Sequence, residues 1–146
     1  MLAWLLSPTE RLARYGRLIR RHSLLLLKTA VTLAVVRLTL STRGYRPVLR
    51  HIGRVMPRAG QRIQLELLAW AIERVAPVVP HATCMTQALA LRYLAAREGQ
   101  HCTIRIGVKQ EPGKSFEAHA WVIADDKIII GGRDENIATF TQIVDL

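Results

Sequence analysis

The hydrophobic pattern changes period at Gly99, and this change limits the possible folds more than any other feature of the sequence. Before Gly99, apolar residues recur every three to four positions, the spacing of helices that bury one face. Residues 101–110 instead alternate between apolar and polar, as a half-buried strand does. The apolar positions that share one face of this strand are Cys102, Ile104, Ile106 and Val108. Helices followed by antiparallel strands predict an α+β fold.

Turn and capping signals divide the chain further. The pattern predicts helices over about residues 8–21, 23–41, 60–75 and 83–97. Gly44 and Pro47 end the second helix, and the basic residues 48–58 form a linker or a short helix. A hairpin follows, with strands "FEAHAWVIA" and "KIIIGG" joined at Asp125-Asp126, and "TFTQIVDL" adds a last strand. We therefore expect a basic helical subdomain over 1–76 and a second unit, with its helix on a small sheet, over 77–146.

Positive charge is concentrated in the first half of the chain. The net charge is +10, yet residues 1–62 contain thirteen Lys and Arg and a single acid, Glu10. Such asymmetry is typical of chains that contact a polyanion, an anionic membrane or an acidic protein surface. A basic helix face that is merely solvated is the alternative.

An apolar stretch over residues 23–40 approaches membrane-spanning length. Lys28 and Arg37 interrupt it, and each central charge costs about 2.5–3.5 kcal/mol on insertion scales. This favours a buried or membrane-surface helix over a spanning one. The start "MLAWLL" lacks a basic region and a cleavage site, so a signal peptide is not expected.

Cys84 is the strongest candidate for a reactive group. It follows Thr83, a good N-cap, and so begins a helix, where unpaired N–H groups and the helix dipole stabilise a thiolate. A cysteine nucleophile also needs a base within reach. On the strand "FEAHAWVIA", His119 is the best base. The alternative is that Cys84 is a small buried apolar residue, which we expect of Cys102.

A metal site is less well supported by the sequence. Nearby candidate ligands are His81, Cys84, His101, Cys102 and His119. Adjacent residues 101 and 102 point to opposite faces of a strand, and no CxxC pair exists. We therefore expect neither a metal nor a cofactor.

The motifs around these two residues resemble a known family. "CMTQALALRYLAAREG", "IRIGV" and "FEAHAWV" are similar to the stand-alone protease component of lasso-peptide biosynthesis, a leader peptidase of transglutaminase-like, papain-like cysteine protease fold. The resemblance is specific over 77–132 and looser over the basic N-terminal helices. It implies a transglutaminase-like core in which Cys84 is the nucleophile and His119 the base.

The same resemblance implies a cytoplasmic enzyme that cuts the leader from a ribosomally made precursor peptide through an acyl-enzyme. Its implied partners are the precursor, a small leader-binding protein and an ATP-dependent lasso cyclase. The basic half either docks one of these proteins or rests on an anionic membrane. Nucleic acid is not an expected partner.

The third catalytic residue does not transfer from the family. Relatives place an Asp a dozen residues after the histidine, where this chain has Gly131. Asp125 and Asp126 at the hairpin tip lie roughly 20 Å from His119. A two-residue hairpin loop would put Gly132 opposite His119 and Asp134 on the same face. Asp134 is therefore the candidate that orients the ring, with a water or a backbone carbonyl as alternatives.

Two other classes of function fit the same residues. One is a transglutaminase-like amidase or acyltransferase that forms an amide bond. The other is a non-catalytic basic scaffold that binds the cyclase or a membrane while Cys84 only packs.

Overall fold

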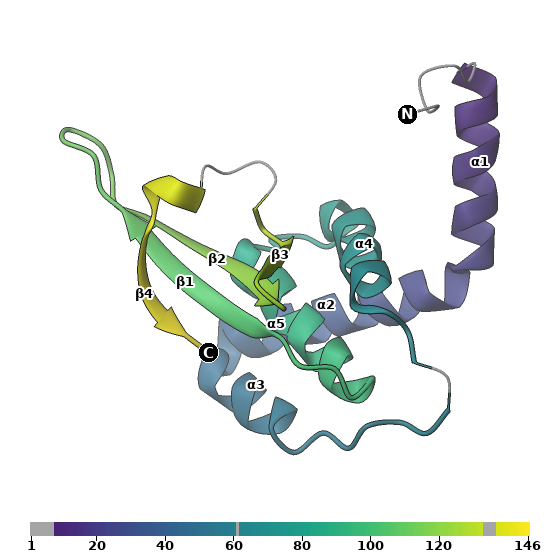
Figure 1. The fold of residues 1–146 in the computed structure, drawn as a ribbon, viewed down its shortest axis with the longest axis horizontal. Helices are drawn as coiled ribbons and strands as arrows, with labels where there is room; N and C mark the ends of the chain where they lie inside the picture. Colours follow the sequence, from purple (N-terminus) through teal and green to yellow (C-terminus); the bar gives the residue numbers. More distant parts are fainter. Residues whose placement is uncertain (1–7, 61, 133–136) are drawn as a thin grey trace.

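A computed structural model describes residues 8–60, 62–132 and 137–146. Its helices are α1 (Pro8–Arg21), α2 (Ser23–Arg43), α3 (Tyr45–Ile52), α4 (Leu65–Val75) and α5 (Cys84–Arg97), with short 3₁₀ helices η1 (Ala76–Val78) and η2 (Ile137–Thr139). Its strands are β1 (Thr103–Lys109), β2 (Glu117–Ala124), β3 (Lys127–Ile130) and β4 (Thr141–Asp145). The α+β prediction is confirmed: the sheet lies to one side of α2–α5, while α1 projects from the body (Figure 1).

The four strands form one antiparallel sheet in the order β3-β2-β1-β4. The predicted hairpin turn is confirmed. Asp125 and Asp126 have φ angles of 47° and 59°, the left-handed pair that a two-residue hairpin loop requires. Ala124 pairs with Lys127 across this loop. The C-terminal strand β4 pairs with β1 at the opposite edge from β3.

The predicted position of Gly132 opposite His119 is wrong. The pairing runs regularly from Ala124 to Ile123, which faces Ile128, but Val122 then faces Ile130 instead of Ile129. One extra residue of β3 is therefore accommodated as a bulge. Because a one-residue shift moves every later side chain to the other face, the simple register fails before His119.

The core is centred on α5. This helix packs against α2, α3 and α4 on one side and against β2 on the other. It is apolar on nearly every side, as a fully surrounded helix must be. Its buried apolar residues are Ala88, Leu89, Ala90, Leu91, Leu94 and Ala95. Helices before and after the predicted boundary at 76/77 share this cluster, and the two-unit division stays a prediction.

The segment before α4 differs from the prediction, because α4 begins at Leu65 and not near residue 60. Glu98 binds Arg58 and Ile63, two residues of the connection that precedes α4. The carboxylate of Glu98 is fully buried and accepts hydrogen bonds from the Ile63 N–H and from Arg58 Nε, both at 2.9 Å. Burial alone would raise the pKa of Glu98, but these two partners hold it below its ordinary value. This buried ion pair ties the connection between α3 and α4 to the end of α5.

Candidate active site

A cavity of about 640 Å³ opens where α4, α5 and the sheet meet. Cys84 and Gln87 line it from the first turn of α5, and His119 lines it from β2. Glu73 and Arg74 contribute from the last turn of α4. Cys84 and His119, the two residues that the sequence singled out, are 35 positions apart in the chain and border the same cavity.

Local backbone structure fixes the position of Cys84. Thr83 is the N-cap of α5, as predicted: its hydroxyl accepts from the Thr86 N–H at 3.4 Å and contacts the Thr86 hydroxyl at 3.1 Å. His81 adopts a left-handed φ of 58°, and its carbonyl accepts from the Thr83 N–H at 2.8 Å. This tight turn directs the chain from η1 into the helix. Cys84 is the first helical residue, and its N–H has no partner within the helix.

Gln87 has its side chain engaged locally. Its Nε2 donates to the Ala82 carbonyl at 3.0 Å, across the turn that leads into α5. This bond braces the loop before Cys84 and uses a donor that would otherwise face the cavity. The N–H of Cys84 is therefore the better candidate to stabilise an oxyanion beside the sulfur.

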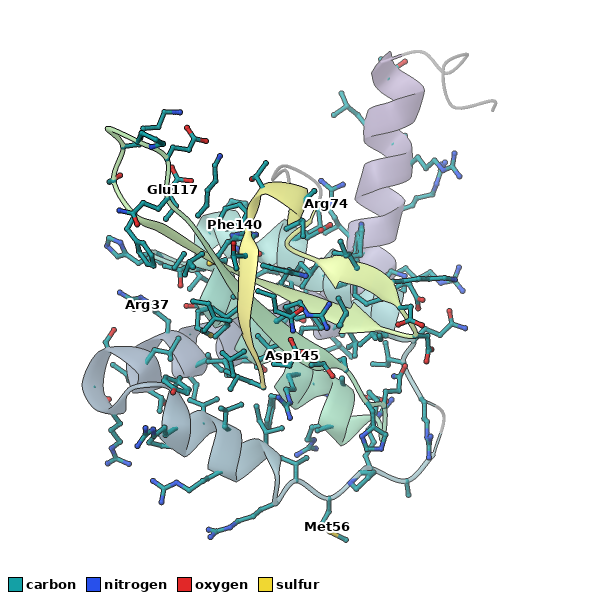
Figure 2. All side chains as sticks on the ribbon, turned by 60° about the vertical axis from the view of Figure 1, so that its left-hand side comes forward. Arg37, Met56, Arg74, Glu117, Phe140 and Asp145 are labelled. Atoms are coloured by element: carbon teal, nitrogen blue, oxygen red, sulfur yellow. The ribbon has the colours of Figure 1, made fainter. Side chains whose placement is uncertain are left out.

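His119 lies on the sheet face that points away from α5. Its neighbours Ala120 and Val122 belong to the core cluster, so strand alternation puts His119 and Trp121 on the other face. The ring lies 6.1 Å from Trp121 and 5.6 Å from Phe140, measured between centroids. Phe140 stands next to the sheet in Figure 2. No hydrogen bond joins His119 to Cys84 within the described ranges.

Opposite this cluster, Gly107 faces His119 on β1. A Cβ at this position would approach the Trp121 ring to 2.8 Å and the Phe140 Cβ to 3.0 Å. Only glycine therefore leaves room for both aromatic rings beside the histidine. The glycine in the "IRIGV" motif thus has a packing role next to the site.

A backbone carbonyl orients the imidazole. His119 Nε2 lies 2.6 Å from the Gly131 oxygen, and because a carbonyl only accepts, Nε2 carries the proton. Nδ1 is then the basic nitrogen of the neutral ring. Gly131 has a φ of 87°, and a Cβ there would lie 2.9 Å from the Ala120 oxygen. An aspartate does not fit here in this conformation, although this is the position at which the family resemblance leads one to expect an aspartate.

Asp134, the predicted orienting residue, lies outside the described residues. Asp125 and Asp126 occupy the hairpin tip, as expected, at the far end of β2 from His119. A backbone carbonyl was one of the alternatives to Asp134 as the group that orients the ring. The described structure contains such a contact, from the Gly131 carbonyl to His119.

Cys102 has the structural role that its strand position predicted. It packs against the core cluster, and burial raises the pKa of its thiol to about 11. Over the described ranges, no group of three His, Cys, Asp or Glu is placed to hold a metal ion. The prediction that Cys102 is inert and Cys84 is not can be tested directly.

We expect limiting iodoacetamide to label Cys84 in the folded protein and to leave Cys102 unmodified. Cys84 is reachable through the cavity, whereas with a pKa of about 11 only about one Cys102 thiol in a thousand is ionised at pH 8. Peptide mapping by mass spectrometry reads the labelled site, and both cysteines should react in denaturant. Preferential labelling of Cys102 in the folded state would contradict this assignment.

Sequence reasoning missed several residues of the cavity. Glu73 and Arg74 belong to a helix whose other side is core, and Gln87 looks like an ordinary helix residue. For Gly131 the sequence did offer a signal that it belongs to the site, because the resemblance aligned it with the family's Asp. Its backbone oxygen, not a side chain, makes the contact.

Comparison with known families agrees with this arrangement. A family model for the transglutaminase-like superfamily matches residues 24–145, most of the chain. The chain belongs to the transglutaminase-like superfamily. No curated protein and no solved structure matches it. Membership in this superfamily indicates cysteine-protease or acyltransferase type chemistry, and the match extends over α2, α3 and α4 as well as over the helix and sheet that carry Cys84 and His119.

Proposed function

We propose that this transglutaminase-like protein is the cysteine peptidase that removes the leader from a lasso-peptide precursor. The observation that carries the proposal is the shared cavity: a cysteine at a helix N-terminus and a histidine with a fixed tautomer border the same space. The motifs "AREG", "IRIGV" and "FEAHAWV" around these residues support the finer assignment to a leader peptidase.

The first half of the reaction is acylation. Cys84 gives its proton to Nδ1 of His119, and its sulfur attacks the carbonyl carbon of the peptide bond between leader and core. The Cys84 N–H stabilises the resulting oxyanion. His119 then returns the proton to the leaving amine, so that the C–N bond breaks, the core peptide departs and the leader stays attached as a thioester. Because the ring lies on the sheet face that points away from α5, it must turn toward the cavity in this step, and Nε2 then gives up its bond to the Gly131 carbonyl.

The second half is hydrolysis. Nδ1 of His119 removes a proton from water, which attacks the thioester carbonyl. The C–S bond breaks, the leader leaves as a free acid, and the proton returns to the Cys84 sulfur. Before each turnover the Gly131 carbonyl holds Nε2–H, which keeps Nδ1 as the nitrogen that takes the proton. Each proton transfer by such a group is typically worth about 10²–10⁴ in rate.

The proposal includes the partners and the location that the resemblance implies. A small leader-binding protein presents the precursor, and an ATP-dependent cyclase takes the freed core amine. All three proteins would work in the cytoplasm. No further cofactor is required, because the thiol, the imidazole and water supply every atom of the reaction.

A transglutaminase-like acyltransferase is the second candidate, favoured by the superfamily match itself. Both enzymes would form the same thioester, and they differ in whether water or an amine accepts the acyl group. Mass spectrometry of the products after incubation with precursor and leader-binding protein distinguishes them. We expect a free leader acid and an intact core. A cross-linked or amidated product would replace the peptidase assignment with an acyltransferase.

A further inference from the structure

The outward face of α2 carries an apolar stripe that the described part of the chain leaves exposed. Its members recur three or four residues apart and lie along one side of the helix: Leu24 (82% exposed), Leu27 (63%), Val31 (56%), Val35 (57%) and Leu38 (66%). Fourteen residues of helix separate its ends, a length of about 21 Å. Contiguous exposed apolar surface of this extent marks a binding face in a soluble domain.

The opposite side of α2 is attached to the protein core. Leu25, Leu33 and Val36 are buried in the cluster around α5. Among the described helices, α2 alone has the length and composition to cross a bilayer, a property that buried core helices share. Because one side of it is committed to the domain, α2 can lie against a membrane but cannot cross it without leaving its core contacts.

Five hydroxyl side chains of α2 are satisfied within the helix itself. Five hydroxyls each bond the carbonyl four residues earlier, at 2.8–3.1 Å: those of Thr29, Thr32, Thr39, Ser41 and Thr42. This back-bonding suits apolar surroundings, where no water or partner group replaces the lost hydrogen bonds. Thr29 and Thr32 lie on the buried side. The bonds of Thr39, Ser41 and Thr42 are exposed, so these hydroxyls keep their hydrogen bonds where hydrocarbon replaces water.

Charge around the stripe is positive throughout. Residues 11–65 contain thirteen Lys and Arg and no Asp or Glu. Helix α1 joins the first turn of α2 and projects from the body (Figure 1), with exposed Leu12 and Ile19 on one side of the helix and exposed Arg14 and Arg17 on the other. Basic amphipathic helices of this kind bind membrane interfaces, buried about 5–10 Å deep. A second copy fits poorly, because a two-fold dimer would set basic faces against each other.

We propose that α1 and the outward face of α2 form a lipid-binding surface that seats this protein on an anionic bilayer. The apolar stripe enters the acyl boundary, and the surrounding arginines contact lipid phosphates. Helices α4 and α5 stand between α2 and the sheet, so the cavity at Cys84 stays open on the other side. Precursor and partner proteins would reach the cavity from the water side.

Vesicle sedimentation of the full chain tests the proposal. We expect it to pellet with vesicles of equal parts phosphatidylcholine and phosphatidylglycerol, and at least about tenfold less with phosphatidylcholine alone. Binding should weaken between about 0.1 M and 1 M salt, since screening shortens the reach of the arginines. The double variant Leu27→Gln/Leu38→Gln should bind the anionic vesicles at least about tenfold more weakly.

The control is Met56→Gln/Ile143→Gln, which removes two equally exposed apolar side chains far from the stripe (82% and 60% exposed). Met56 points away from the body in Figure 2. This variant should bind like the parent, and both variants should melt like it because their side chains are exposed. If the stripe variant fails to fold, Arg14→Gln/Arg17→Gln provides the same comparison through charge.

Three outcomes would overturn the proposal. The first is a parent protein that stays in the supernatant with anionic vesicles, or that binds neutral vesicles equally well. The second is a parent that sediments as a dimer which Leu27→Gln/Leu38→Gln dissociates, since a second copy would then cover the stripe. The third is a stripe variant that loses the leader-binding protein while the parent ignores vesicles, which would assign the face to a protein.

Discussion

Replacing Cys84 with Ala should lower the rate of leader removal by at least about 10⁴-fold and leave the fold intact, because no other group can form the thioester. The sulfur borders the cavity and is only partly packed against the core, so its loss costs little stability. The measurement is release of core peptide by purified variant supplied with precursor and leader-binding protein, with a thermal melt of the same sample.

The matched control is Cys102→Ala. It removes the second thiol, which lies just before β1, packs against the core and is not among the residues that line the cavity. We expect activity near that of the parent and a loss of stability of about 1 kcal/mol from the small void. Core peptide released by Cys84→Ala at the parent's rate would end the proposal of a cysteine enzyme.

The second large effect is expected at His119. Both His119→Ala and His119→Gln should lower the rate by about 10²–10⁴-fold. The pair of variants separates two roles of the ring. A glutamine amide can still donate to the Gly131 carbonyl, as Nε2 does now, but it transfers no proton. If proton transfer is what matters, glutamine rescues nothing.

His51→Ala is the control for loss of a stacked imidazole. His51 stacks on Tyr93 with ring centroids 5.9 Å apart, a packing much like that of His119 on Trp121, but it does not line the cavity at Cys84. Its removal should leave cleavage unchanged. Near-parent activity in His119→Gln would show that the residue acts only through packing, and the base would have to be sought elsewhere.

The local features around Cys84 were predictable because they depend on neighbours in the chain. Thr83 was expected to cap α5 and does so through Thr86, a bond within one helical turn. The period-two pattern after Gly99 located β1 and assigned Cys102 to the core face. The hairpin loop at Asp125-Asp126 was also predictable, because a turn depends on the residue types at adjacent positions.

The arrangement around His119 was not predictable, because it depends on contacts between strands. A bulge near Ile129 shifts the register of β3 against β2. The residue types around Ile129 give no signal that would predict this bulge. The shift brings a carbonyl to the imidazole, and a carbonyl is present at every residue, so composition carries no signal for it. The prediction of Asp134 rested on a regular pairing that the ladder does not keep at Val122. Asp134 itself lies outside the described residues, so its role stays a prediction.

The sequence by itself determined the order of elements, the asymmetry of charge and the two residues on which the chemistry is proposed. These follow from periodicity and residue type, which act over a few positions of the chain. Only the tertiary structure decided that the Gly131 carbonyl holds the ring of His119. It also decided that the apolar face of α2 that points away from α5 stays exposed. Both depend on which surfaces meet in three dimensions, and the free energy of that packing is shared among residues far apart in the chain.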